Sequence, residues 1–372
     1  MDLNLNIEQS ILKDSARDFL KAECPKSLVR EVREWEDDYP EELWHKMAEM
    51  GWMGVLIPEE YDGIGGDFLD LTILIEVMGQ ACLPAPFFST VVIGGTALLL
   101  AGSKEQKKDL LPKIIAGELV VSYALIEPGN WYGFSNVNTS AVEEGDSYII
   151  SGTKLFVEYA RSANYILCAA RVANEGLALF LVKADNPSIK MKLFNTLSYD
   201  YQCEVVFEDV KVPKENLLSL GQPANDLLAT LEERGALAKC AEMLGCMQPA
   251  FEMSLAYAKE REQFGRLIGT FQAIQHHCVN MVIDLNSARY ITYLAAWKIA
   301  QGLPAAKEAA MAKSYTSAAS NRVIKLGHQI HGAISYCDEH DMHLFYRKAK
   351  AASIAFGDTD HHLEKVAQHL GL

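Results

Sequence analysis

The sequence predicts an α+β protein with an N-terminal α-helical domain, a middle antiparallel β-barrel domain and a C-terminal four-helix bundle. Three observations support this order. Apolar residues recur at helical spacing in the first third of the chain, short β-branched runs follow in the middle, and helical spacing then returns. We expect domain boundaries that give the segments 1–117, 118–215 and 216–372.

The N-terminal segment has two groups of apolar residues that each fall on one face of a helix. The first group is Ile7, Ile11, Leu12, Phe19 and Leu20, and the second is Phe68, Leu71, Leu74, Ile75 and Met78. A glycine-rich run at 62–66 and two prolines within 83–86 interrupt the pattern. We therefore expect several separate helices, each of which buries one face.

Short apolar or β-branched runs begin near residue 120. They cover 120–125, 148–151, 154–157, 165–172, 177–182 and 204–212. Polar turns such as Glu144-Gly145-Asp146 separate them, as is typical of antiparallel strands. These runs predict a compact β domain of about 100 residues.

Helical spacing returns after Pro213 and continues to the end of the chain. Four long stretches, at 224–261, 272–301, 305–331 and 340–357, are separated by Gly or Pro. Four long consecutive helices favour a bundle.

Composition excludes several kinds of partner. The chain has 372 residues, 49% of them hydrophobic, and a net charge of −15. An acidic chain is a poor match for nucleic acid or an anionic membrane surface, because both attract basic patches. No stretch approaches the length of apolar sequence that a membrane-spanning helix needs, so we expect neither nucleic acid nor membrane as a partner.

The N-terminus and the cysteines indicate a cytoplasmic protein. The first ten residues lack the basic-then-apolar order of a signal peptide. The eight cysteines are scattered, and no two have C-x-x-C spacing. We expect buried free thiols in a reducing compartment.

Four short motifs follow one another along the chain. They are Ala-Leu-Ile-Glu-Pro-Gly at 124–129, Gly-Thr-Lys-Leu-Phe-Val at 152–157, Tyr-Ala-Lys-Glu-Arg-Glu-Gln-Phe-Gly at 257–265, and Gln-Ile-His-Gly-Ala at 329–333. Their order and spacing resemble those of the acyl-CoA dehydrogenase family over essentially the whole chain. The resemblance implies FAD as cofactor and an acyl-CoA thioester as the substrate of an α,β-dehydrogenation. It also implies electron-transfer flavoprotein or a similar acceptor.

The resemblance also implies cofactor contacts. The residues concerned are Leu125, Phe156, Arg261, Phe264, Gln272, Gln329, Gly332 and Thr359. In the family, the segments around Arg261 and Gln329 hold the FAD of a neighbouring subunit, so a homo-oligomer or an α2β2 heterotetramer is implied. A guanidinium such as Arg261 can pair bidentately with a pyrophosphate, and glycines at 265 and 332 permit close approach of the backbone.

The two positions where the family keeps its catalytic carboxylate both hold glycine. They are Gly357, in the run Phe356-Gly357-Asp358, and Gly235 on the first long helix of the bundle. Asp358 and Glu242 are candidate substitutes; Glu242 returns to nearly the face of Gly235 but lies about 10 Å along the helix. The structural alternatives are a capping contact for Asp358 and a buried helix–helix hydrogen bond for Glu242.

The flavin-facing segments also depart from the family pattern. Asn130-Trp131-Tyr132-Gly133-Phe134 replaces a run of small residues, and Ile126 and Glu158 stand where threonines are common. The histidine pairs 328/331, 340/343 and 361/362 give no reason to expect the three or four convergent ligands of a metal site.

Three functional hypotheses remain open. The first is an FAD-dependent acyl-CoA dehydrogenase, with a branched or cyclic acyl chain suggested by small and aromatic residues near the empty positions. The second is a half-site or non-catalytic subunit of a heteromeric acyl-CoA dehydrogenase. The third is a non-redox acyl-CoA binding or lyase-type protein on the same fold.

Overall fold

The computed structural model describes residues 5–35, 38–130 and 137–372. Its backbone contacts divide the chain into two compact units. The helical unit comprises Met1–Arg30, Phe68–Leu83 and Ala236–Leu372, and the β unit comprises Glu31–Asp67 and Pro84–Gly235. Residues of the predicted N-terminal segment 1–117 thus contribute to both units.

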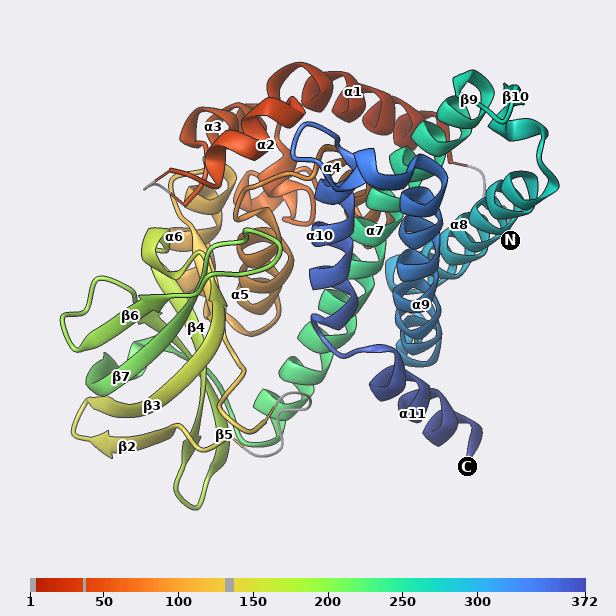
Figure 1. The fold of residues 1–372 in the computed structure, drawn as a ribbon. Coiled ribbons are helices and arrows are strands. Elements are labelled where there is room, and N and C mark those ends of the chain that lie inside the picture. The colour runs from red at the N-terminus through yellow and green to blue at the C-terminus, as the bar shows by residue number, and fades with distance from the viewer. Residues whose placement is uncertain (1–4, 36–37, 131–136) are drawn as a thin grey trace. The chain divides into compact units, whose positions relative to one another are not determined.

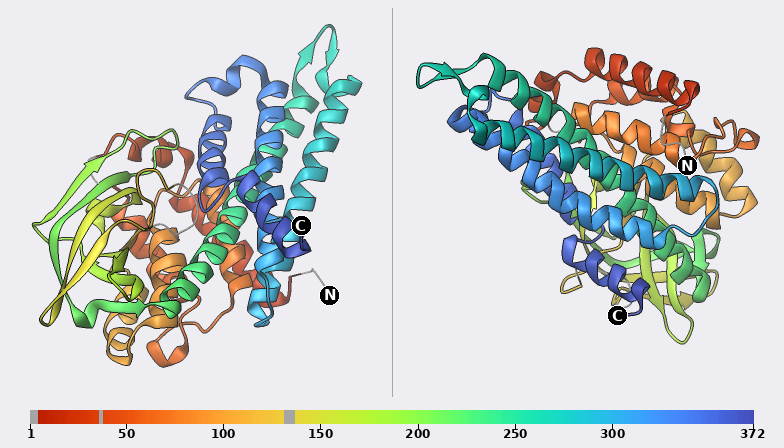
Figure 2. Two further views of the ribbon diagram at one scale, coloured as in Figure 1. Left: turned by 90° about the horizontal axis from the view of Figure 1, so that it is seen from below. Right: turned by 90° about the vertical axis from the view of Figure 1, so that its right-hand side faces the viewer.

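The helical unit is built from long helices (Figure 1). Its principal elements are α1 (Ile7–Glu23), α4 (Phe68–Ala81), α7 (Gln222–Glu260) from residue 236 onward, α8 (Gln272–Ala300), α9 (Ala306–His331), α10 (Met342–Ile354) and α11 (Thr359–Leu370). Figure 2 shows α8 and α9 side by side, while α10 and α11 pack on α9. The predicted helical bundle is confirmed, and α11 is an additional helix beyond the four predicted stretches.

Two glycines allow α4 and α7 to cross at very short distance. A Cβ atom on Gly245 would lie 2.1 Å from the backbone oxygen of Glu76, and one on Gly79 would lie 2.4 Å from that of Glu242. Real side chains do not fit at such distances, so both positions require glycine. The crossing brings the backbones of the two helices into direct contact.

The carboxylate of Glu76 is buried beside this crossing and is the centre of a polar network. It accepts a hydrogen bond from Tyr293 Oη at 2.6 Å and pairs with Lys13 at 3.1 Å and Arg289 at 3.5 Å. Burial alone would raise the pKa of Glu76, but the two cations and the hydrogen bonds outweigh it and keep that pKa below 4.5. The network joins α1, α4 and α8.

The β unit contains one mixed sheet. Its strands are β1 (Val121–Ala124), β2 (Ser140–Glu144), β3 (Ser147–Glu158), β4 (Tyr165–Val172), β5 (Gly176–Lys183), β6 (Ile189–Leu193), β7 (Gln202–Pro213) and β8 (Leu217–Leu220). They lie in the order β6-β7-β3-β2-β4-β5-β8, and β1 pairs with β4. The helices α3 (Glu41–Glu49), α5 (Thr96–Ala101) and α6 (Lys104–Ile115) belong to the same unit.

The prediction of a purely antiparallel barrel was wrong in one respect. Both β1 and β2 pair with β4 in parallel, whereas the other pairings are antiparallel. Strand composition does not reveal this difference. Long connections separate β1 and β2 from β4 in sequence, and such connections permit parallel pairing where a tight hairpin does not.

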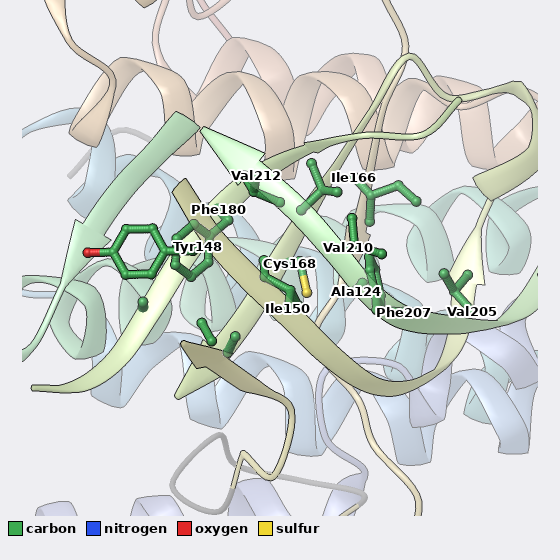
Figure 3. Packing of buried hydrophobic residues seen from close by; sticks show 14 of the residues in the cluster. Ala124, Tyr148, Ile150, Ile166, Cys168, Phe180, Val205, Phe207, Val210 and Val212 are labelled. Atoms are coloured by element: carbon green, nitrogen blue, oxygen red, sulfur yellow. The ribbon is translucent and has the colours of Figure 1, made fainter. Parts of the chain in front are cut away.

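The inner face of the sheet forms a continuous apolar core (Figure 3). The rings of Tyr148 and Phe180 lie 5.0 Å apart at one end of this core. Ile150, Cys168 and Phe207 are buried members of the same core. The alternating runs of the sequence supply these side chains from neighbouring strands.

Two expectations about the whole chain can be compared with the described residues. None of the helices in the described ranges is long and apolar enough to cross a membrane. All eight cysteines are free thiols, with six buried, Cys278 half-buried and Cys337 exposed.

Replacement of Glu76 by glutamine tests the network beside the helix crossing. Glu76→Gln leaves two cations near a neutral amide, so we expect the free energy of unfolding to fall by about 3 kcal/mol. Urea denaturation followed by circular dichroism measures the change. Asp14→Asn, which removes an exposed ion pair with Arg17, is the control and should cost less than about 0.5 kcal/mol. Equal effects of the two substitutions would show that the network contributes no more than a surface pair.

Candidate functional site

Two of the four sequence motifs meet at one end of the helical unit. The ring of Tyr257, on α7, stacks on the imidazole of His331, on α9, with centroids 4.6 Å apart. Arg261 follows Tyr257 by about one helical turn, and Gly332 directly follows His331. The contact therefore brings the Arg261 and Gln329 segments together, and we call this region the cofactor face.

A short hairpin extends the cofactor face beyond α7. Strands β9 (Glu262–Gln263) and β10 (Arg266–Leu267) pair across Phe264 and Gly265. Phe264 has a left-handed backbone with φ of 54° and a ring that is 92% exposed. Below it, the guanidinium of Arg266 lies 4.0 Å from the ring centre of Phe271. The hairpin thus holds an aromatic ring in solvent, as expected of a surface that binds another molecule.

The residues of the cofactor face that the resemblance assigns to FAD are open to solvent and include a cation suited to a phosphate group. Arg261, Gln272 and Gln329 are all exposed, and within the described ranges Arg261 has no acidic partner. Gly332 has φ of +70°, and a Cβ atom there would meet nothing within 4 Å. An unneutralised guanidinium beside open backbone suits a phosphate ligand.

The other two motifs meet in the β unit around a buried ion pair. Lys154 Nζ lies 2.7 Å from Glu127 Oε1. The same carboxylate accepts hydrogen bonds from the backbone nitrogens of Asn138 and Thr139 and from the Thr139 hydroxyl. Burial opposes ionisation, but Lys154 and these donors keep the pKa of Glu127 below its usual 4.5. Glu127 and Lys154 of these motifs therefore hold the turn after β1 onto β3.

Leu125 and Phe156, which the resemblance assigns to the cofactor, lie beside this ion pair in sequence. Leu125 is only 3% exposed, whereas Phe156 is half-buried and its ring centre lies 5.5 Å from that of Phe194. Phe156 and Tyr159 both have positive φ, of 57° and 53°. Positive φ in bulky residues is unusual and often marks functional segments. Glu158 is buried between them, and Trp131–Phe134 lie outside the described residues.

Gly357, which the resemblance aligns with a carboxylate position of the family, lies in a backbone conformation that disfavours any side chain. Its φ is +96°, and a Cβ atom would lie 2.4 Å from His361 Cδ2 and 2.7 Å from His362 Nε2. Two imidazole rings therefore fill the space that a side chain at 357 would enter. Glycine is favoured here because φ is positive and because any side chain would have to displace two imidazole rings.

A buried lysine holds the loop at Gly357 through hydrogen bonds to the backbone. Lys313, on α9, is fully buried and donates hydrogen bonds to the backbone oxygens of Gly357 at 2.6 Å and Ser353 at 3.0 Å. Burial lowers the pKa of Lys313 to about 8. Sequence reasoning missed this residue. Its signal was a lone lysine in the run of alanines and serines that forms the buried face of α9.

The two candidate substitute bases both have structural partners. Glu242 lies between Lys239 at 3.0 Å and Lys348 at 3.3 Å. Burial alone would raise the pKa of Glu242, but the two lysines keep it below 4.5. The carboxylate of Asp358 caps α11 and accepts a hydrogen bond from the backbone nitrogen of His361 at 2.9 Å. These contacts favour the structural interpretation of both residues.

The structure also describes two further predicted positions. Gly235 is buried within α7, and Thr359 is the half-buried first residue of α11. Within the described ranges, no three His, Cys, Asp or Glu side chains form a group that could hold a metal ion.

Alanine substitutions at two glycines separate backbone strain from crowding. Gly357→Ala combines a positive φ with overlap of two imidazoles, so we expect it to cost about 2 to 4 kcal/mol of unfolding free energy. Gly302, in the α8–α9 loop, also has positive φ, of +65°, but open space around it. Gly302→Ala should therefore cost only about 1 kcal/mol. Urea denaturation compares the two variants, and equal costs would contradict the crowding at 357.

Comparison with known proteins covers the whole chain. Models of the N-terminal, middle and C-terminal domains of acyl-CoA dehydrogenases match residues 6–118, 122–210 and 229–371. The probable acyl-CoA dehydrogenase YngJ of Bacillus subtilis (strain 168) is 32% identical, over 97% of each chain. The caffeyl-CoA reductase-Etf complex subunit CarC of Acetobacterium woodii is 32% identical, over 94% of each chain.

A solved structure agrees with these sequence relatives. The ChsE4-ChsE5 complex from Mycobacterium tuberculosis aligns with a TM-score of 0.92 and 25% identity, over 100% of this chain and 99% of the matched one. The expected fold, with helical, β and helical domains in this order, is thereby confirmed. The chain belongs to the acyl-CoA dehydrogenase family, whose members are oxidoreductases that act on acyl-CoA.

Proposed function

We propose that this chain is a subunit of a heteromeric, FAD-dependent acyl-CoA dehydrogenase and that a second chain supplies the catalytic base. The observation that carries the proposal is the conformation of Gly357. Its φ of +96° disfavours any side chain, and a side chain at this position would have to displace the imidazoles of His361 and His362.

The chemistry explains why this position matters. An α,β-dehydrogenation removes a proton from the α-carbon of the thioester and a hydride from the β-carbon. FAD, when bound, accepts the hydride. The proton requires a carboxylate with a free lone pair, but Glu242 is held by two lysines and Asp358 caps a helix. These contacts support the view that the chain alone lacks a base.

Unlike the enclosed position 357, the cofactor face is exposed to solvent. Arg261 would pair with the pyrophosphate, Gln272 and Gln329 would hydrogen-bond the cofactor, and Gly332 would admit it close to the backbone. All of these residues are exposed in the single chain. The cofactor face is exposed at one end of α9, and the base position at 357 is closed near the other end. This contrast supports a role in which the chain contributes to a site in a neighbour, as in an α2β2 heterotetramer. The matched ChsE4-ChsE5 structure is likewise a complex of two different chains.

Substrate and electron acceptor follow from the family. We propose an acyl-CoA thioester, with a branched or cyclic acyl chain, and electron-transfer flavoprotein or a similar protein as acceptor. The relative from Acetobacterium woodii, which is a subunit of a caffeyl-CoA reductase-Etf complex, supports such an acceptor.

An autonomous dehydrogenase is the second candidate, because the relative YngJ, itself a probable acyl-CoA dehydrogenase, aligns along nearly the full length of this chain. The visible spectrum separates the two candidates. Purified alone, the chain should show little flavin absorbance and no bleaching by butyryl-CoA, since it has no base. Co-expression with full-length family chains from the same organism should yield a yellow complex. Full bleaching of the isolated chain by butyryl-CoA would refute the heteromeric proposal and favour the autonomous one.

The contribution of Arg261 can be measured in that complex. Arg261→Gln removes a charge-assisted bidentate contact to the pyrophosphate, so FAD should bind about 10- to 100-fold more weakly. Equilibrium dialysis against FAD measures the change. Lys307→Gln, an exposed cation at the opposite end of α9, is the matched control and should leave the affinity unchanged. Unchanged affinity in Arg261→Gln would remove Arg261 from the cofactor face.

A further inference from the structure

Four histidines gather at the end of the helical unit that carries the cofactor face. The histidine cluster comprises His328 and His331 on α9, His340 before α10, and His343 on α10. His328, His331 and His343 are between 5% and 7% exposed, and the rings of His331 and His340 lie 4.8 Å apart. The cluster lies next to the short segment η7 (Gly332–Tyr336), which begins with the glycine of the cofactor face.

Hydrogen bonding defines the tautomer of His328. The Ser335 hydroxyl donates its only hydrogen to the backbone oxygen of Gly332 at 2.7 Å. His328 Nδ1 lies 2.8 Å from the same hydroxyl oxygen, and with that hydrogen directed to Gly332 the contact is satisfied by a proton on Nδ1. Nε2 of His328 is then an unprotonated acceptor, and it is buried without a partner among the described residues.

Hydrogen bonds also assign ring nitrogens on the other three histidines. His331 Nδ1 donates to the backbone oxygen of Gly327 at 2.9 Å, and His343 Nε2 donates to that of Asp338 at 3.1 Å. A carbonyl can only accept, so both donor nitrogens are assigned. Nδ1 of His343 is buried without a partner among the described residues, and Nδ1 of His340 accepts from the Met342 backbone nitrogen.

Protonation of this cluster is therefore costly. A second proton on His328 or His343 would create a buried N–H group without an acceptor. Besides Tyr257, the titratable or charged groups that face the cluster are Arg30, Tyr336, Asp338, Asp341, Tyr346 and Arg347. Asp341 is already paired with Arg30 at 2.6 Å, and Asp338 lies 4.0 Å from His343. Two carboxylates beside two guanidiniums cannot neutralise several imidazolium ions.

The pKa directions agree with this geometry. Burial, followed by the neighbouring histidines, lowers the pKa of His328 from 6.5 to about 4. Burial also lowers the pKa values of His331, His340 and His343. The neutral cluster thus belongs to the closed structure, and acid favours any state in which the rings reach water.

The segment Gly332–Tyr336 has few other attachments. The Tyr336 ring stacks on His328 with centroids 4.4 Å apart but is 71% exposed, and Ile334 is 52% exposed. Ser335 is the buried residue of the segment, and its hydroxyl is bonded to His328. His328 therefore provides both the polar and the aromatic contact that hold the segment.

We propose that the histidine cluster is an acid-sensitive latch, which holds the segment Gly332–Tyr336 closed while its rings are neutral and releases it when they are protonated. Gly332 belongs to the cofactor face, so release would weaken its contact with a neighbour's FAD. That consequence rests on the proposed function, whereas the latch itself does not.

Hydrogen exchange tests the latch without cofactor or substrate. Amide protection in residues 332–341 is measured at pH 7.5 and 5.0, corrected for the intrinsic dependence of exchange on pH. The pKa of His328 is 6.5 when the ring is open to water and about 4 in the closed structure. Because of this difference, the protection of the segment should fall by about tenfold or more between pH 7.5 and pH 5.0. The double variant His328→Asn/His343→Gln keeps amide donors near Nδ1 and Nε2 but cannot titrate, so its protection should change less than about threefold. His276→Gln, an exposed histidine on α8, is the matched control.

Each result decides the proposal. A loss of protection in wild type and His276→Gln, confined to the segment and absent from the double variant, supports the latch. If the wild-type segment is equally protected at pH 7.5 and pH 5.0, the latch is overturned without reference to any variant. An equal loss in the double variant, or a loss spread evenly over α8 and α9, also overturns it. None of these outcomes depends on whether a partner chain is found, so failure of the latch is distinguishable from failure of the proposed function.

Discussion

The helical unit depends on one steric constraint, which is the close crossing of α4 and α7 at Gly79 and Gly245. The backbone that each glycine contacts belongs to a glutamate of the other helix, Glu76 or Glu242. Both carboxylates are therefore held in a tightly packed interior, where an ionised group needs partners. Lys13 and Arg289 form ion pairs with Glu76. Lys239 of α7 and Lys348 of α10 form ion pairs with Glu242. Position at the crossing thus explains why Glu242 has a structural role.

A comparable buried charge organises the β unit. The pair of Glu127 and Lys154 joins the turn after β1 to the middle of β3, and two backbone nitrogens and a hydroxyl complete the carboxylate's hydrogen bonds. A buried ion pair adds little net stability over apolar packing, but a single broken partner is costly. The Glu127–Lys154 pair therefore acts mainly by specifying one arrangement of the two motifs. Phe156, whose backbone has a positive φ, lies two residues after Lys154.

The functional proposal rests on a contrast within the helical unit. Arg261, Phe264 and Gly332 are open to solvent. Gly357, in contrast, is enclosed by His361 and His362, and its backbone oxygen accepts a hydrogen bond from Lys313. The contrast is consistent with a subunit that retains its contribution to a neighbour's cofactor. The histidine cluster lies next to Gly332 of the cofactor face, and the proposed latch would make the position of this glycine depend on pH.

The sequence by itself determined the order of helical, β and helical segments and the four motifs, because apolar periodicity and short-range spacing are local properties. It also led to the hypothesis that Gly235 and Gly357 stand at the base positions of the family. Only the tertiary structure decided that Glu242 and Asp358 have structural partners, that Lys313 supports the loop at Gly357, and that β1 and β2 pair in parallel with β4. These features depend on contacts between residues far apart in the chain. Burial, hydrogen-bond partners and space around a Cβ atom arise from packing, which no local pattern encodes.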